Sequence, residues 1–289
     1  MAQITAALVK QLREMTDSPM MECKKALVEA DGDMDVAVDV LRKNGLAKAA
    51  KKAGRETNEG AVAAFVSEDG KSGALLELSC ETDFVGSNAK FTGFASKVAE
   101  VVATTEPADV DALLEKPMGE ETVSSELTEM IHIMGENMKI ARFSARKAEN
   151  GALASYIHMG GKIGVLVEFA FEKAETAQAD SFKTFAHDVA MQIAATAPVA
   201  ASRDDVPAET VEHELSIYKA QAAESGKPEA IQERMAQGRL EKYFKEFVLT
   251  EQEFVKDSSV TIDALAKKTS KDLGDDIKVK SFVLYRFGE

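Results

Sequence analysis

The chain has 289 residues with 49 acidic and 35 basic side chains, which gives a formal net charge of -14 at pH 7. A field of this sign repels phosphates and argues against a general nucleic-acid or anionic-membrane binder, although it leaves room for a local basic patch. Two cysteines and four histidines exclude a disulfide framework and several metal sites, and no apolar stretch is long enough to span a membrane.

Residues 1–54 predict a small domain of three helices. Apolar residues at helical spacing indicate the first helix: Ile4, Leu8 and Leu12. The second is expected to begin at Ser18-Pro19, with Ser18 as N-cap and Pro19 as the first helical residue. After a break at 31–33, the third helix is expected to stop at Gly45, which would form a left-handed cap.

A basic segment, residues 42–55, follows within and after this third helix. It lacks acids and carries six basic side chains: Arg42, Lys43, Lys48, Lys51, Lys52 and Arg55. A solvated helix and linker explain it most simply. The alternative is a nucleic-acid or ribosome-binding protein that uses this linker, with an affinity that falls steeply with salt.

An internal repeat dominates the middle of the chain. A shift of 91 residues places Gly60-Ala61-x-Ala63 on Gly151-Ala152-x-Ala154 and continues through the phenylalanines, which pair as Phe91 with Phe182 and Phe94 with Phe185. Each copy predicts two strands joined by a tight turn and then a helix. In the first copy, Asp69-Gly70 indicates a type I′ turn.

Further strands are predicted at 137–147 and 277–287. Two helices with a turn at Ser225–Pro228 are predicted to form an antiparallel coiled-coil hairpin. The fold class is therefore α+β, with a duplicated antiparallel-sheet-plus-helix core. We expect four parts: the helical domain 1–54, a first core repeat 55–147, a second core repeat 148–205 with 248–289, and the hairpin insertion 206–247.

No pattern predicts an enzyme. Cys23 and Cys80 lack a catalytic signature, and the histidines lack metal-ligand spacing. The glycines between His158 and Gly164 lack the spacing and the hydroxyl residue of a phosphate loop, so hairpin chemistry explains them. We therefore expect no catalytic residue, metal, cofactor or direct nucleotide binding.

The two repeats diverge where the second strand of each one ends. After Glu81 the first copy continues Thr82-Asp83-Phe84-Val85, and the second copy has no counterpart of the Asp-Phe pair. Loops beyond strand ends often carry function. Phe84 is then either an exposed wedge that seeks an apolar slot on a partner, or a core residue that folds back onto its own repeat.

These residues also carry a family resemblance. The segment 77–85, ELSCETDFV, closely resembles the core signature of bacterial elongation factor Ts, and residues 12–27, LREMTDSPMMECKKAL, resemble its N-terminal signature. The resemblance implies a guanine-nucleotide exchange factor that binds elongation factor Tu and speeds GDP release during translation elongation. It also implies a bacterial cytoplasmic location, which agrees with the absence of a targeting pattern. The three N-terminal helices also resemble ubiquitin-associated (UBA) folds, a fold analogy that implies no ubiquitin binding.

The resemblance assigns partner contacts as well. In the family, the Asp-Phe pair inserts between two helices of the GTPase domain and disturbs its magnesium and phosphate site, which implicates Asp83 and Phe84 with their neighbours Thr82 and Val85. It further implicates two groups of residues, one in the N-terminal domain and one in the second core repeat: Arg13, Met20, Met21 and Lys24; and His158, Phe254 and Val255.

Some features depart from the family pattern or stay open. Gly86-Ser87-Asn88 replaces a more usual continuation and is expected to loosen the loop. The sequence stops at Glu289, where many members continue into a C-terminal helical module that also contacts the GTPase. A homodimer or a 2:2 complex with the GTPase is left open, whereas neither nucleic acid nor a membrane is expected as a partner.

Overall fold

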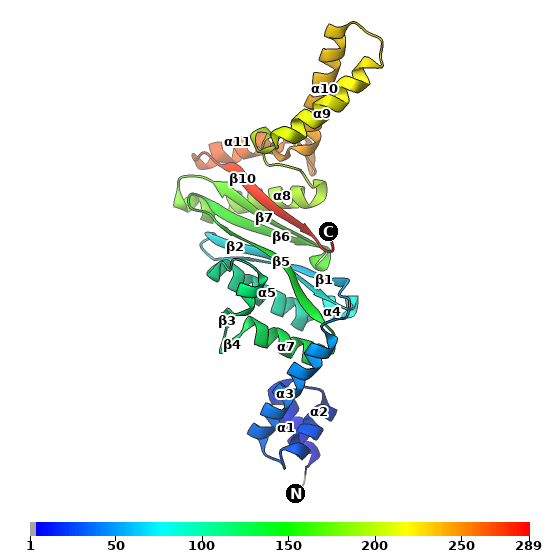
Figure 1. The fold of residues 1–289 in the computed structure, drawn as a ribbon. Helices are drawn as coiled ribbons and strands as arrows, with labels where there is room; N and C mark the ends of the chain where they lie inside the picture. Colours follow the sequence, from blue (N-terminus) through cyan, green and yellow to red (C-terminus); the bar gives the residue numbers. More distant parts are fainter. Residues whose placement is uncertain (1–3) are drawn as a thin grey trace.

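Two antiparallel sheets stacked face to face form the centre of the molecule, as the computed structural model of residues 4–289 shows (Figure 1). The first has the strand order β1-β2-β5 and the second β10-β7-β6. Their strands are β1 (Glu59–Val66), β2 (Ser72–Cys80), β5 (Met138–Lys147), β6 (Ala152–His158), β7 (Ile163–Ala170) and β10 (Lys278–Arg286). The predicted α+β class and the two additional strands are confirmed.

Helices cover the outer face of each sheet. On the first repeat these are α5 (Ala89–Thr105), α6 (Val110–Leu114) and α7 (Val123–Met134), preceded by the short α4 (Asp83–Gly86) and joined by β3 (Pro117–Met118) and β4 (Glu121–Thr122). On the second they are α8 (Asp180–Thr196) and α11 (Ile262–Leu273), with β8 (Glu253–Phe254) and β9 (Asp257–Thr261). Each repeat thus has its own core between a sheet and its helices.

The repeat extends beyond the shift of 91 residues. Helices α5 and α8 have the same length, and each ends at a left-handed residue, Glu106 with φ 44° and Ala197 with φ 45°. A short hairpin, a helix and a final strand follow in both copies. The second copy is interrupted by α9 (Ala208–Ala223) and α10 (Glu229–Phe247), which pack against each other and project from the core (Figure 1).

The faces between the two sheets contain the buried residues Val62, Leu75, Ala148, Leu153, Leu166 and Tyr285. Glycines allow the sheets to approach closely. A Cβ atom on Gly164 would lie 2.4 Å from Val62 Cγ1, and one on Gly161 would lie 2.6 Å from Ala61 Cβ. These positions require the smallest residue because interiors are close-packed.

Helices α1 (Ala6–Thr16), α2 (Met20–Glu29) and α3 (Met34–Lys52) form the N-terminal module, residues 4–52, at the end of the molecule opposite α9 and α10 (Figure 1). Two predictions about this module are wrong. Pro19, not Ser18, is the N-cap of α2, since Ser18 is buried and its hydroxyl donates to the Thr16 carbonyl at 3.4 Å.

The third helix does not stop at Gly45. It continues to Lys52 because Gly45 lies in the contact between α3 and α7, where an added Cβ would meet His132 at 3.5 Å. Packing of the backbone against a neighbouring side chain outweighs the intrinsic tendency of glycine to end a helix.

The turn between β1 and β2 also differs from its prediction. Gly70 has φ 69°, but Asp69 is not among the residues with positive φ, so the turn is not of type I′. The Asp69 carboxylate accepts from the Ser67 hydroxyl at 2.5 Å and from the Lys71 amide at 3.0 Å. These bonds stabilise a longer connection with a single left-handed glycine.

Candidate partner-binding surface

The segment where the repeats diverge forms a single exposed helical turn, α4, directly after β2. Thr82 is its N-cap, and the hydroxyl of Thr82 accepts from the Val85 amide at 3.4 Å. The side chain of Phe84 is 83% exposed, the most exposed of the large apolar residues in the described chain. The alternative in which Phe84 folds back onto its own core is therefore wrong.

The residues after Phe84 hold this turn on the core. Val85 packs against the first core, and Gly86 is buried so close to β1 that an added Cβ would lie 3.2 Å from Gly60 Cα. The hydroxyl and the amide of Ser87 both donate to the Asp83 carbonyl, each at 2.9 Å. The expectation that Gly86-Ser87-Asn88 loosens the loop is wrong, because the glycine permits close packing and the serine closes the turn.

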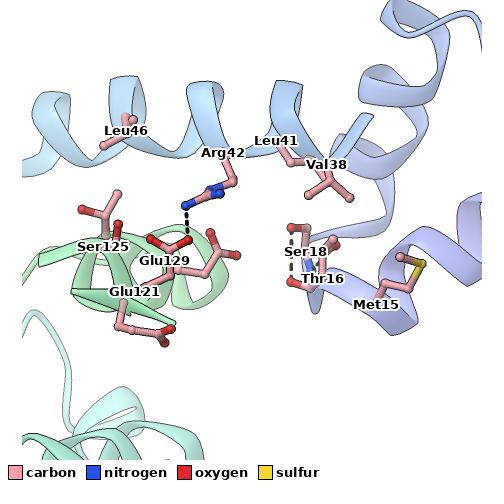
Figure 2. A pocket seen from close by; sticks show the side chains of 12 residues that line it. Met15, Thr16, Ser18, Val38, Leu41, Arg42, Leu46, Glu121, Ser125 and Glu129 are labelled. Atoms are coloured by element: carbon pink, nitrogen blue, oxygen red, sulfur yellow. Dashed lines mark hydrogen bonds and ion pairs between the residues drawn. The ribbon is translucent and has the colours of Figure 1, made fainter. Parts of the chain in front are cut away.

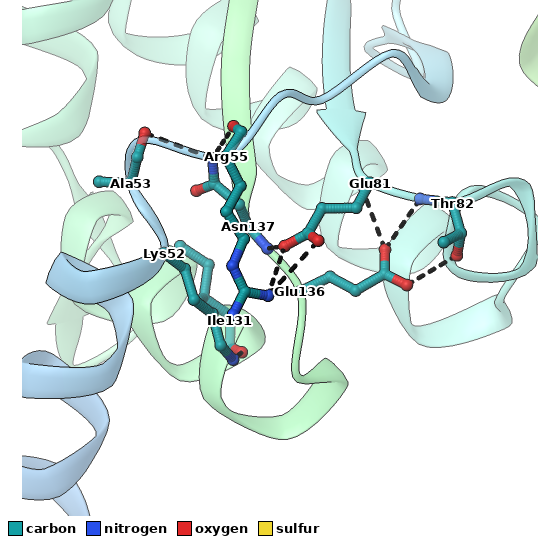
Figure 3. Close-up of polar contacts among 8 residues, drawn as sticks. All are labelled: Lys52, Ala53, Arg55, Glu81, Thr82, Ile131, Glu136 and Asn137. Carbon is teal, nitrogen blue, oxygen red and sulfur yellow. Dashed lines mark hydrogen bonds and ion pairs between the residues drawn. The ribbon is translucent and has the colours of Figure 1, made fainter.

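A carboxylate from another element fixes the start of the turn (Figure 3). Glu136, between α7 and β5, accepts from the Glu81 amide at 3.2 Å and from the Thr82 amide at 3.0 Å. It also accepts from the Thr82 hydroxyl at 2.7 Å. In return, the Glu81 carboxylate accepts from the Asn137 amide at 2.6 Å and from Arg55 at 3.2 Å. The base of α4 is thus bonded to two other segments of the chain.

The N-terminal residues assigned to a partner all lie on exposed parts of α1 and α2: Arg13, Met20, Met21 and Lys24. An ion pair of 3.0 Å joins Asp17, at the end of α1, to Lys90, at the start of α5. Since α5 follows α4 after two residues, this pair ties the end of α1 to the segment just after the Phe84 turn, and helices α2 and α4 lie on the same side of the molecule in Figure 1.

His158 lies at the end of β6 and is exposed, in the turn that leads to β7. Lys162 in this turn forms an ion pair of 2.6 Å with Glu59, the first residue of β1. Glu59 also pairs in register with Cys80, which directly precedes the loop of Phe84. The His158 turn and the Phe84 turn therefore lie at the same end of the stacked sheets.

Met159 belongs to this surface and was not predicted from the sequence. It is 68% exposed and has φ 50°, in the left-handed region that non-glycine residues rarely adopt. The signal was available in the sequence as an apolar residue directly before Gly160-Gly161.

The two remaining residues, Phe254 and Val255, differ in their exposure to solvent. Phe254 is buried in the second core, so its side chain does not belong to an accessible surface. Val255 is 51% exposed, and its amide donates to the Gln192 side chain on α8 at 2.9 Å. Only Val255 of this pair is available to a partner.

The basic segment 42–55 is mostly helical and largely paired. Arg42 forms an ion pair with Glu121, Lys48 with Glu22 and Arg55 with Glu81, and Lys52 donates to the Ile131 carbonyl at 3.3 Å. The positive charges of these side chains are thus directed toward acceptors of the same chain, which weakens the case for a nucleic-acid site.

Other features offer little for chemistry. Cys23 and Cys80 are buried, and burial together with the nearby Glu136 raises the pKa of Cys80 to about 11, so its thiol stays neutral. No cluster of metal-ligating side chains occurs among residues 4–289, and no helix in that range is long and apolar enough to cross a membrane.

A cavity of about 300 Å³ lies beside the contact between the N-terminal module and α7 (Figure 2). Apolar side chains of the module, including Met15 and Leu46, face the acidic side chains of Glu121 and Glu129 across it. Burial and the neighbouring Glu126 raise the pKa of Glu129. The Arg42–Glu121 ion pair bridges the cavity, so polar contacts hold the module where packing is incomplete.

Comparison with known proteins connects this surface to a family. The sequence model described as Elongation factor TS matches residues 81–289, a range that begins at the base of the Phe84 turn. Elongation factor Ts of Clostridium perfringens (strain SM101 / Type A) is 49% identical over 287 residues, which are 99% of this chain and 93% of the relative. The chain belongs to the elongation factor Ts family.

Other members of the elongation factor Ts family are similarly close. That of Clostridium kluyveri (strain ATCC 8527 / DSM 555 / NBRC 12016 / NCIMB 10680 / K1) is 46% identical over 289 residues, and that of Trichlorobacter lovleyi (strain ATCC BAA-1151 / DSM 17278 / SZ) is 45% identical over 289 residues. Both comparisons cover 99% of this chain and 93% of the relative. The family relationship therefore includes the N-terminal module, which lies outside the range of the family model.

Proposed function

We propose that this protein is a guanine-nucleotide exchange factor for elongation factor Tu and acts through Asp83 and Phe84. The observation that carries the proposal is the 83% exposed phenyl ring on a turn anchored at both ends, within a chain of the elongation factor Ts family. An exposed aromatic group on a rigid base is suited to entering an apolar slot on a partner.

In the proposed mechanism, the Asp-Phe turn enters between two helices of the GTPase domain and disturbs the magnesium and phosphate site. No covalent bond is made or broken, so the protein is not an enzyme that catalyses a chemical reaction. It binds the nucleotide-free GTPase more tightly than the nucleotide-bound one. By linkage, the ratio by which the nucleotide weakens binding of this protein equals the ratio by which this protein weakens binding of the nucleotide.

One side chain is not sufficient for this work. A ~1000-fold faster release requires roughly 4 kcal/mol of differential stabilisation. Burial of one phenylalanine contributes about 1.5–3 kcal/mol. We therefore propose two further contacts on the same side of the molecule: Met20 and Met21 with Arg13 and Lys24 on the N-terminal module, and His158 with Met159 on the second repeat. The distance between these contacts lets the protein hold the GTPase while the turn is inserted.

The proposal also assigns the parts of the chain. The helical module, the two core repeats and the helical hairpin correspond to residues 1–54, 55–147, 148–205 with 248–289, and 206–247, and separate hydrophobic clusters support this division. We propose that the module and the two repeats contact the GTPase, in the bacterial cytoplasm where translation elongation takes place.

The test is the release of a fluorescent GDP analogue from elongation factor Tu in the presence of excess unlabelled GDP. Wild-type protein should accelerate release strongly, and Phe84→Ala should lose about tenfold to a hundredfold of that acceleration, because one buried phenyl contact is removed. Val199→Ala truncates another exposed apolar residue, 51% exposed and distant in sequence, and should keep the wild-type rate.

Circular dichroism spectra should be identical for the three proteins, because none of the changes touches a core residue. No acceleration by folded wild-type protein would reject the proposed function. Full activity of Phe84→Ala would retain exchange but reject the role of the turn.

A further inference from the structure

We infer that Glu136 is a positioning residue for exchange, which fixes the direction in which Asp83 and Phe84 are presented. This inference rests on the proposed function. Glu136 itself is half-buried at the base of the turn and is not proposed to touch the GTPase.

The geometry shows how the carboxylate acts. One oxygen of Glu136 accepts from the amides of Glu81 and Thr82, at 3.2 and 3.0 Å, and the other accepts from the Thr82 hydroxyl at 2.7 Å (Figure 3). Because the Thr82 hydroxyl donates its proton to Glu136, its oxygen is oriented to accept from the Val85 amide, and it thereby caps α4. The carboxylate therefore fixes both the strand end and the cap from which the Asp-Phe turn begins.

On its N-terminal side the turn is also held by the Cys80 thiol, which donates to the Thr82 carbonyl at 3.1 Å, and by the Glu81 carboxylate, which accepts from Asn137 and Arg55. The Ser87 amide donates to the Asp83 carbonyl, and Val85 and Gly86 anchor the turn after Phe84, but none of these contacts fixes the Thr82 side chain. Loss of the Glu136 carboxylate would leave two amides and a hydroxyl without their acceptor, and the Thr82 rotamer would no longer be set. The turn would then sample several orientations, and a partner would have to order it on binding.

The second repeat contains the same arrangement, a carboxylate that accepts from two amides and a threonine hydroxyl, but it lacks the Asp-Phe pair. Asp275, between α11 and β10, accepts from the amides of Glu172 and Lys173 at 3.1 and 3.0 Å and from the Thr176 hydroxyl at 2.6 Å. Burial raises the pKa of Asp275, but these hydrogen bonds outweigh it and the pKa is lowered. The repeat thus supplies a matched control, in which an equal loss of hydrogen bonds leaves the Asp-Phe turn untouched.

The experiment measures GDP release from elongation factor Tu as a function of exchange-factor concentration. Four proteins are compared with wild type: Glu136→Gln, Asp275→Asn, Phe84→Ala and the double variant Glu136→Gln/Phe84→Ala. Both conservative amides keep the side-chain volume but replace one acceptor oxygen by a donor group. The maximal rate and the half-saturating concentration are determined separately, with circular dichroism to establish folding.

We expect Glu136→Gln to lower the maximal rate about tenfold, with a half-saturating concentration within about twofold of wild type, because the other contacts persist. Asp275→Asn should keep the wild-type rate. In the Phe84→Ala background Glu136→Gln should have a much smaller effect than in wild type, since only Asp83 of the pair remains to be positioned. If Glu136→Gln does not fold, Thr82→Val removes the hydroxyl that joins Glu136 to the cap of α4 but leaves both amide bonds to the carboxylate, and it should also lower the maximal rate.

Three results would overturn the inference: full activity of Glu136→Gln, equal losses in Glu136→Gln and Asp275→Asn, or independent losses from Glu136→Gln and Phe84→Ala. Each would leave the exchange function intact, because wild-type protein in the same series would still accelerate release. Failure of wild type would reject the proposed function, and the inference with it.

Discussion

At the scale of single residues, Phe84 shows how neighbouring residues keep an apolar side chain exposed to solvent. An exposed phenyl ring gains nothing from the folded chain, since its burial would be worth about 1.5–3 kcal/mol. It remains outside because its neighbours are fixed: Thr82 by Glu136, and Val85 and Gly86 by the core. In the proposed complex the ring recovers this energy on the GTPase, and little is lost in ordering it.

His132 is a second residue in an unusual environment, under α3 near Gly45. Its side chain is 1% exposed, and its Nε2 atom lies 3.4 Å from Glu22 Oε2. The charged groups facing it are Glu22 from α2 and Lys48 and Lys52 from α3. Burial lowers the pKa of His132, with Glu22 opposing and the two lysines adding to the shift.

The lowered pKa predicts acid sensitivity. At a pH near and below the unfolded histidine pKa of about 6.5, the unfolded chain binds this proton more readily than the folded chain. Stability is therefore fully present above that pH and is lost as the pH falls through it. Thermal unfolding of wild type and His132→Phe between pH 8 and 5.5 should show a steeper loss for wild type. Parallel pH profiles would contradict this account of His132.

At the scale of elements, the spacing of the two sheets depends on glycine. We expect Gly164→Ala to destabilise the protein by about 1–3 kcal/mol, because its Cβ would lie 2.4 Å from Val62 Cγ1. Val62→Ala alone should also destabilise, by about 2 kcal/mol, through lost burial. In the double variant the smaller side chain leaves room for the new methyl group, so the combined loss should be smaller than the sum.

Urea unfolding of the four proteins measures this coupling, and additive losses would contradict a direct contact between the sheets at this point. Gly93→Ala provides the control. Gly93 is exposed in α5 with no atom near an added Cβ, so alanine should stabilise the helix by up to about 1 kcal/mol.

The elements also show what the sequence could and could not predict. The repeat predicted both sheets and helices α5 and α8, because hydrophobic periodicity and turn residues are local signals. The end of α3 was missed, since continuation through Gly45 depends on its contact with His132 on α7. Spacing left the exposure of Phe84 undecided, and the resemblance assigned Phe254 to a partner surface although it is buried. Both outcomes depend on neighbours far away in the chain.

The sequence predicted only those residues of the candidate surface that lie within continuous motifs. Residues 82–85 and the exposed residues of α1 and α2 lie in such motifs. Glu136, Asn137 and Met159 lie outside them and were missed, since their relation to the turn arises only when β5 and β6 assume their places in the sheets.

At the scale of the whole molecule, the proposed contacts share one side of an elongated body (Figure 1). The Asp17–Lys90 and Lys162–Glu59 ion pairs connect the N-terminal module and the second repeat to the region of the Phe84 turn. In the proposed mechanism, this arrangement separates the contacts that would hold the GTPase from the one that would disturb its nucleotide site. It agrees with the need for more binding energy than one side chain provides.

In the proposed mechanism, nucleotide and exchange factor oppose each other on elongation factor Tu. The most direct measurement is the dissociation constant of the complex by isothermal titration calorimetry, without nucleotide and with saturating GDP. We predict that GDP weakens binding of this protein by at least about tenfold, and that the protein weakens binding of GDP by the same ratio. Equal affinities for the nucleotide-free and the GDP-bound GTPase would contradict the account.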